Sequence, residues 1–177
     1  ILTPYDDDVD FWRNRETDPV MGSDTRAGIT CYDDLYADVL LWMKNGWIDY
    51  LIPQLYWSME HRLASHRKLA DWWSNNSYGV PVYIGNGPYK IRDDSDEAWK
   101  NPGEINTQIN YARTLPQIQG NAFFSAKSIY IKNQDIAQLL KKEVYDRPTL
   151  PPSFAPKSPA IIEIPVVFDV KTTPEKT

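Results

Sequence analysis

The sequence predicts an α/β fold with parallel strands, and two observations support this fold class. Helical and strand-like patterns alternate along the chain from about residue 30 to residue 145. The predicted strands are also spaced by about 30 to 40 residues, as in strand–helix repeats rather than hairpins. Three strands neither close a barrel nor complete a doubly wound sheet, so we expect the domain to be part of something larger.

A long loop, a helix and a strand are predicted first. Residues 1–29 are acidic and irregular, which is typical of a loop. Thr30 resembles a helix N-cap, because Asp33 stands three residues later as in a capping box, and Gly46 ends the helical pattern. The apolar residues of 48–56 then predict a buried strand.

The alternation continues to the end of the predicted domain at residue 147. The further elements are a helix over 61–75, a strand over 80–84, a helix starting at Asn101 and Pro102, a strand over 121–125, and a helix capped by Asn133. Residues 148–159 are proline-rich and predict a semi-rigid linker. Residues 160–177 alternate like the first strand of a β-sandwich-like module that this chain contains only in part.

The composition argues against several classes of protein. The 177 residues are 42% hydrophobic, which suits one globular domain with a core. A net charge of −5 and a pI near 5.0 argue against a nucleic-acid partner. No apolar run approaches the roughly 18 residues that indicate a membrane span. The single cysteine, Cys31, excludes an internal disulfide and a cysteine-rich metal site.

The predicted strand over 48–56 ends in polar and aromatic residues. Gln54 and Tyr56 share one face of the strand, and Leu55 and Trp57 share the other. Ligands of parallel α/β folds bind at the carboxyl ends of strands, so Gln54 and Tyr56 are candidates to hydrogen-bond a ligand and Trp57 to stack on it. In the alternative interpretation, Gln54 bonds to loop backbone and Trp57 covers a helix.

The next predicted strand ends in the sequence IGNGPYK at residues 84–90. This is neither the dinucleotide fingerprint nor a P-loop, because Pro88 and a long acidic loop follow the two glycines. We therefore do not expect a nucleotide ligand. Gly85 and Gly87 instead allow the backbone to turn sharply and to bring Asn86 and Tyr89 to the strand end.

Candidate acids and metal ligands are few. Glu60 lies just past the first strand end and is the candidate catalytic acid. Hydrolysis of a glycosidic bond usually needs two carboxyl groups, and no complete acid pair is visible in this sequence. His61 and His66 are not in an H-E-x-x-H motif, so neither a metal nor another cofactor is expected.

Five motifs together resemble a known family. They are WRN at 12–14, GWIDYLIPQLYW at 46–57, DWW at 71–73, VYIGNGPYK at 82–90 and GNAFFSAKS at 120–128. In this order and spacing, residues 11–147 resemble the C-terminal half of the bacterial glycosyl-hydrolase-like 10 family, a group of TIM-barrel proteins. The resemblance implies that the predicted strands are the sixth, seventh and eighth of a (β/α)8 barrel, followed by a β-sandwich module.

The resemblance also implies a function, with candidate substrate-binding residues Gln54, Tyr56, Trp57, Asn86 and Tyr89 and, in the loop after the fifth strand, Trp12, Arg13 and Asn14. The implied partner is a polysaccharide, with peptidoglycan glycan strands as one candidate. The mechanism would use two carboxylates, with the main acids outside this chain. We therefore expect a glycoside hydrolase in the full-length protein and little or no activity in this chain alone.

An alternative from a different class is a non-catalytic carbohydrate-binding or cell-wall interaction protein, which would keep the cleft without the acids. The family resemblance implies an extracytoplasmic location. Unpaired strand edges invite pairing, so a further expectation is association with the missing N-terminal half of the barrel or with a second copy of the chain.

Overall fold

The computed structural model describes residues 9–11, 13–26 and 28–148. Trp12, the predicted linker beyond Pro148 and the predicted strand within 160–177 lie outside the described residues. The described chain is a mixed α/β arrangement with short parallel strands, as the sequence predicts. In this part of the chain, no helix is long and apolar enough to cross a membrane.

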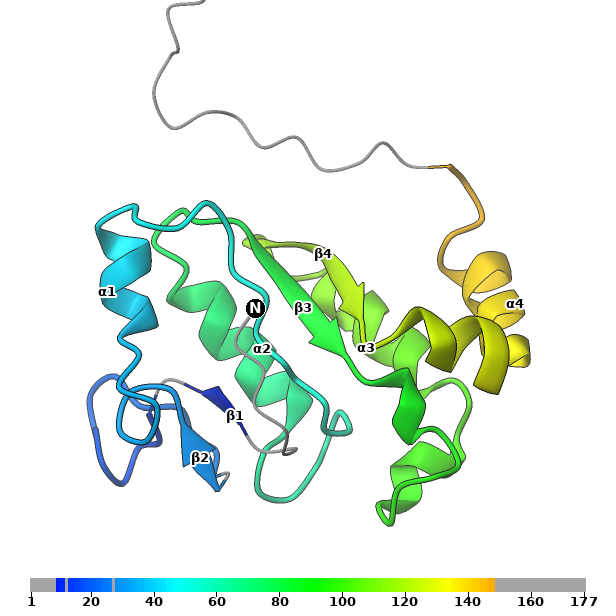
Figure 1. Cartoon of the computed structure of the whole chain (residues 1–177), viewed down its shortest axis with the longest axis horizontal. Coiled ribbons are helices and arrows are strands. Elements are labelled where there is room, and N and C mark those ends of the chain that lie inside the picture. Colours follow the sequence, from blue (N-terminus) through cyan, green and yellow to red (C-terminus); the bar gives the residue numbers. More distant parts are fainter. Residues whose placement is uncertain (1–8, 12, 27, 149–177) are drawn as a thin grey trace, which may run out of the picture.

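The elements follow the predicted alternation of strands and helices. In chain order they are β1 (Val9–Phe11), β2 (Ile29–Thr30), α1 (Val39–Lys44), α2 (His66–Asn75), β3 (Val82–Asn86), η1 (Pro88–Lys90), η2 (Glu97–Lys100), α3 (Glu104–Ala112), β4 (Ile118–Phe123), η3 (Ser128–Lys132) and α4 (Gln134–Glu143). Figure 1 shows β3 and β4 side by side at the centre, with α1 at one end of the molecule and α4 at the other.

The predicted strand over 48–56 is extended and pairs in parallel with β3, but only at isolated bridges that involve Leu51 and Gln54. Tyr83 N donates to Leu51 O at 2.9 Å, and Gly85 N donates to Pro53 O at 2.8 Å. A regular parallel ladder would next need an N–H at residue 53, which proline lacks. Because β4 pairs with the opposite edge of β3, the segment over 51–57, β3 and β4 form one parallel series.

The first predicted helix is the largest correction, since α1 begins at Val39 rather than at Thr30. The Asp34 carboxylate accepts hydrogen bonds from both the N–H and the hydroxyl of Thr30, and the Thr30 hydroxyl accepts from Asp33 N. These bonds close a turn, as short polar side chains do when they compete with a helix. Asp38 is the N-cap that starts α1, accepting from Leu41 N at 3.0 Å.

The prediction of a loop throughout 1–29 is also wrong, because Val9–Phe11 forms β1 and pairs in parallel with β2. A strand of three residues is too short to show a period-two pattern in the sequence. Elsewhere the ends of the predicted elements shift by a few residues: α2 begins at His66 rather than 61, and β4 covers Ile118–Phe123 rather than 121–125.

Two hydrophobic clusters hold the helices against the strands. In the first, Leu69 and Trp73 of α2 pack against Leu55, Val82 and Ile84, and all five side chains are nearly inaccessible to solvent. The second cluster joins α3 to α4 through the fully buried side chains of Ile105, Ile109 and Ile136. The helices therefore bury one face of the parallel strands; all five residues of β3 are buried, so a site is to be sought at the carboxyl ends of the strands.

His66, the first residue of α2, gives the fold a dependence on pH. Its side chain is fully buried, with Nδ1 2.9 Å from Leu55 O. Burial lowers the pKa of His66 from 6.5 to about 4, although the contact with Leu55 acts in the opposite direction and the charge of Arg67 lowers the pKa further. The neutral imidazole is thus the form that the fold accepts.

We expect the free energy of unfolding to be highest above pH 6.5 and to fall as the pH decreases toward 4. In this range His66 takes up a proton in the unfolded chain but stays neutral in the folded one, so a lower pH favours the unfolded chain. The contribution of His66 to this loss is on the order of 3 kcal/mol. Urea unfolding between pH 7 and pH 4 measures it, with His66→Gln as a variant that does not titrate. Equal pH dependence in the two proteins would contradict the assignment.

Candidate functional site

Three aromatic side chains meet where the parallel segments end. Tyr56 follows the segment over 51–54, Tyr89 lies in η1 just after β3, and Phe124 follows β4. The Tyr56 ring lies 5.8 Å from that of Tyr89, edge to face, and 6.2 Å from that of Phe124, nearly parallel to it. Tyr89 and Phe124 are 6.1 Å apart. We call these three residues the aromatic ledge; Phe124 is 56% exposed and the two tyrosines are half-buried.

Two glycines make this arrangement possible. A Cβ on Gly87 would lie 3.1 Å from the ring of Tyr89 and 3.2 Å from that of Tyr56, so the rings would have to move apart. A Cβ on Gly85 would lie 2.7 Å from Pro53 O, which is closer than side-chain carbons approach a carbonyl. The glycines are therefore needed for close packing, rather than for the sharp turn that the sequence suggested.

The predicted alternation holds for Leu55, Tyr56 and Trp57, and it separates Tyr56 from Trp57. Leu55 and Trp57 belong to the hydrophobic cluster on the helix side, where Trp57 is only 7% exposed. Tyr56 joins the ledge, and Gln54 forms the parallel bridge to Gly85. In this structure Trp57 covers the helices, as in the alternative interpretation, and does not offer an exposed ring to a ligand.

Asn86 also turns toward the helices and not toward the ledge. Its side chain is fully buried and donates from Nδ2 to Gln108 Oε1 of α3 at 2.9 Å. Gln108 Nε2 in turn donates to Trp57 O and to Glu104 Oε1, both at 3.1 Å. Met59 N completes this Gln108 network by donating to Glu104 Oε1 at 2.8 Å. The network fixes the carboxyl ends of two neighbouring strands to α3.

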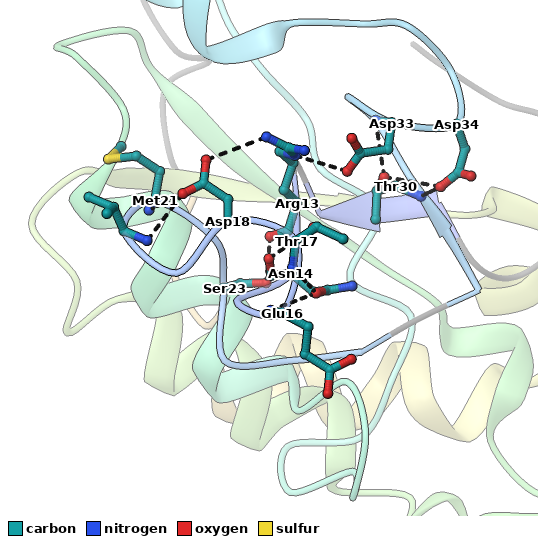
Figure 2. Close-up of polar contacts among 11 residues, drawn as sticks. Arg13, Asn14, Glu16, Thr17, Asp18, Met21, Ser23, Thr30, Asp33 and Asp34 are labelled. Carbon is teal, nitrogen blue, oxygen red and sulfur yellow. Dashed lines mark hydrogen bonds and ion pairs between the residues drawn. The ribbon is translucent and has the colours of Figure 1, made fainter.

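Arg13 and Asn14 hold the N-terminal loop together, as Figure 2 shows. Arg13 Nε donates to Asp33 Oδ2 at 2.9 Å, and this bond is the main reason why the pKa of Arg13 is raised. A second carboxylate, of Asp18, lies 3.6 Å from Arg13 Nη1. The Asn14 side-chain oxygen accepts from the backbone N–H groups of Glu16 and Thr17. Both residues therefore shape the loop, and neither lies in the aromatic ledge.

Glu60, the candidate catalytic acid, lies on the surface next to a cation. Arg67 Nε donates to Glu60 Oε1 at 2.6 Å, and the Glu60 side chain is 70% exposed. It lines an open hollow of about 530 Å³, together with Ser58, Met59, His61, Arg62, Asp94, Ser95, Asp96, Ala98 and Glu104. We call this the acidic hollow. The arrangement resembles a surface ion pair and lacks the apolar surroundings that a proton-donating carboxyl group generally needs.

Besides Glu60, the acidic hollow contains three acids that sequence reasoning did not select, namely Asp94, Asp96 and Glu104. Burial alone would raise the pKa of Asp96, but hydrogen bonds from the Ser58 hydroxyl at 2.5 Å and from Ala98 N outweigh it and hold the pKa below its ordinary value. Glu104 is 7% exposed and belongs to the Gln108 network. The carboxylates of Asp96 and Glu104 thus bind groups of the protein itself. Their contacts join residues about 40 apart in sequence, which spacing alone does not reveal.

No group of three or more His, Cys, Asp or Glu side chains in the described ranges is arranged to hold a metal ion.

Residues 11–101 match the family model for glycosyl hydrolase-like 10 proteins, which is about half of the chain. The chain belongs to this family. The match covers β2, the segment over 51–57, β3 and η1, and so includes Tyr56 and Tyr89 of the aromatic ledge. Phe124 lies beyond the matched residues.

Curated relatives are similar over a longer part of the chain. Glycosyl hydrolase YngK of Bacillus subtilis is 40% identical over 161 residues, which is 86% of this chain and 31% of that protein. Glycosyl hydrolase DigH of Escherichia coli K12 is 37% identical over 120 residues, which is 64% of this chain and 27% of that protein. The chain therefore spans about three tenths of the length of these relatives.

Replacing Glu104 tests whether the Gln108 network is structural. Glu104→Ala leaves the buried Met59 N–H without its acceptor, so we expect the free energy of unfolding to fall by about 2 kcal/mol or more. Glu104→Gln keeps a side-chain oxygen at the same place and serves as the matched variant, with less than half that loss. Urea unfolding of both variants measures the difference, and equal stability would show that the carboxylate oxygen has no such role.

Proposed function

We propose that this chain supplies part of the substrate-binding cleft of a glycoside hydrolase with a TIM barrel, and that the aromatic ledge binds the sugar rings of a polysaccharide. The observation that carries the proposal is the meeting of Tyr56, Tyr89 and Phe124 at the carboxyl ends of three parallel segments. Ligands of parallel α/β folds bind at that edge. Membership of the glycosyl hydrolase-like 10 family favours a carbohydrate as the ligand.

Rings that are half-buried and packed against one another suit this task. Each tyrosine has an apolar ring and a polar hydroxyl, which matches the mixed apolar and hydroxylated faces of a sugar. The rings are also fixed before a ligand arrives, since Tyr56 and Tyr89 pack around Gly87 and Phe124 N donates to Asn86 O at 3.0 Å. Little conformational entropy is then lost on binding.

In the proposed barrel, the segment over 51–57, β3 and β4 are the sixth, seventh and eighth strands. Their parallel order and the helices α2 and α3 between them support this assignment. In the described part of the chain, β4 pairs with β3 along one edge only. We propose that the remaining strands come from the N-terminal half of the barrel, with a second copy of the chain as the other possible partner.

We further propose a two-carboxylate mechanism whose main acids lie outside this chain. Asp96 and Glu104 are engaged by protein donors, and Glu60 is paired with Arg67, so the described residues offer no pair of carboxyl groups beside the ledge. Peptidoglycan glycan strands are the proposed substrate, and an extracytoplasmic location follows from such a substrate. A non-catalytic carbohydrate-binding protein is the second candidate, because the ledge alone would suffice for binding.

Calorimetric titration of the full-length protein with soluble, peptide-free glycan fragments of peptidoglycan tests the proposal. We expect Tyr89→Ala and Phe124→Ala to weaken binding by roughly tenfold, which corresponds to about 1.4 kcal/mol. Tyr78→Ala is the matched control, because Tyr78 is 48% exposed and precedes β3, at the opposite end of that strand from Tyr89. We expect it to change the affinity by less than twofold.

Measuring new reducing ends in the same samples distinguishes a glycoside hydrolase from a non-catalytic carbohydrate-binding protein. Hydrolysis by the full-length protein would support the enzyme, and binding without hydrolysis would support the non-catalytic protein. If the ledge variants bind the glycan as tightly as the unchanged protein, the ledge is not the binding site.

A further inference from the structure

A second hollow borders the acidic hollow, with which it shares Arg62, and is rich in cations. It has a volume of about 390 Å³ and is lined by Arg15, Glu16, Ser23, Asp24, Thr25, Arg26, Arg62, Leu63 and Lys68. We call it the basic hollow. Four of these residues are positively charged and two are negatively charged, so its lining has a formal charge of +2 in a chain whose net charge is −5.

The acids of the basic hollow neutralise only half of its cations. Arg26 pairs with Glu16, and Lys68 Nζ lies 2.8 Å from Asp24 Oδ2. The hydrogen bond from Lys68 lowers the pKa of Asp24, and the charges of Arg15 and Arg26 act in the same direction. Arg15 and Arg62 enter no ion pair found between described residues, and both side chains are exposed. The excess positive charge therefore belongs to these two guanidinium groups.

The wall of the basic hollow is held in shape by its own loop. Arg15 N donates to Ser23 O at 2.9 Å, and Ser23 N donates to Arg13 O at 2.8 Å, which closes the loop around residues 14–23. The Ser23 and Thr25 hydroxyls are buried and lie 2.7 Å apart. These contacts fix the backbone of the loop that carries Arg15.

One of the two loops that form the basic hollow follows the segment over 51–57, whose carboxyl end belongs to the proposed cleft. Residues 13–26 follow β1, and Arg62 and Leu63 come soon after Tyr56 of the aromatic ledge. Arg26 N donates to Leu63 O at 2.6 Å and joins the two loops. Six residues of chain reach at most about 22 Å, so Arg62 lies within that distance of Tyr56. A glycan chain is long enough to contact both places at once.

We propose that the basic hollow is an anion-binding subsite that recognises a carboxylate or sulfate group carried by a sugar of the polysaccharide. The choice of a sugar as the ligand rests on the proposed function, whereas the position of the subsite rests on the arrangement of Arg15 and Arg62 alone. Arg15 and Arg62 bind the anionic oxygens through paired N–H donors, the contact for which a guanidinium is suited. The exposed side chain of Leu63 contacts the apolar face of the same sugar.

Three soluble oligosaccharides with the same backbone test the subsite: one with carboxylates, one with the carboxyl groups reduced to alcohols, and one with sulfate esters. Calorimetric titration of the full-length protein gives the affinity for each. We expect Arg15→Gln and Arg62→Gln each to weaken binding of an anionic ligand by about fivefold, and binding of the neutral one by less than twofold. Arg147→Gln removes one charge from a side chain that is 89% exposed and is the matched control.

The outcomes distinguish this inference from the proposed function. Preference for the carboxylated or the sulfated ligand, lost in both arginine variants, supports the subsite and identifies the anion. Equal affinity for all three ligands, unchanged in the variants, overturns the subsite and leaves the ledge in place. If no oligosaccharide binds, the proposed function fails. Titration with sodium sulfate, followed through the side-chain NMR signals of Arg15 and Arg62, then shows whether the basic hollow binds an anion. Shifts in both signals support an anion site, and their absence overturns it.

Discussion

The side chain of Gln108 joins three segments of this chain that must stay together for a site to exist. Its amide donates to Trp57 O and Glu104 Oε1 and accepts from Asn86 Nδ2, and Gln108 is fully buried. Both polar atoms of the Gln108 amide are hydrogen-bonded, whereas the buried Asn86 Oδ1 has no partner among the described residues, and an unpaired polar group in the interior is costly. The carboxyl ends of the segment over 51–57 and of β3 are therefore held to α3 by hydrogen bonds of defined geometry, in addition to hydrophobic packing.

Near the carboxyl ends of the strands, side chains on one face stabilise the core, and side chains on the other face form the proposed binding surface. Side chains alternate along a strand, so Leu55 and Trp57 enter the core while Tyr56 faces the other way. The same rule directs Asn86 to α3, on the side where Val82 and Ile84 pack against α2. Gly85 and Gly87 then let neighbouring groups approach closely on the opposite face. The aromatic ledge thus depends on the core that packs against the other face of the strands.

Sequence reasoning predicted the alternating order of elements and the parallel strands, because both follow from hydrophobic spacing. It also separated Tyr56 from Leu55 and Trp57 by the period of the strand. It failed for α1, where Thr30 and Asp34 bond to each other rather than starting a helix, and for β1, which is too short to show a period. The roles of Glu104, Asp96 and the basic hollow rest on contacts between distant residues, such as Met59 with Glu104 and Arg26 with Leu63, and no local pattern encodes these.

A crystal structure of the full-length protein with a bound oligosaccharide tests most directly whether the ledge is a binding surface. We expect a sugar ring to lie against Tyr89 or Phe124, with Trp57 still buried and the Gln108 network unchanged. An oligosaccharide bound elsewhere, with the three ledge rings covered by other parts of the protein, would contradict this and assign Tyr56, Tyr89 and Phe124 to the core.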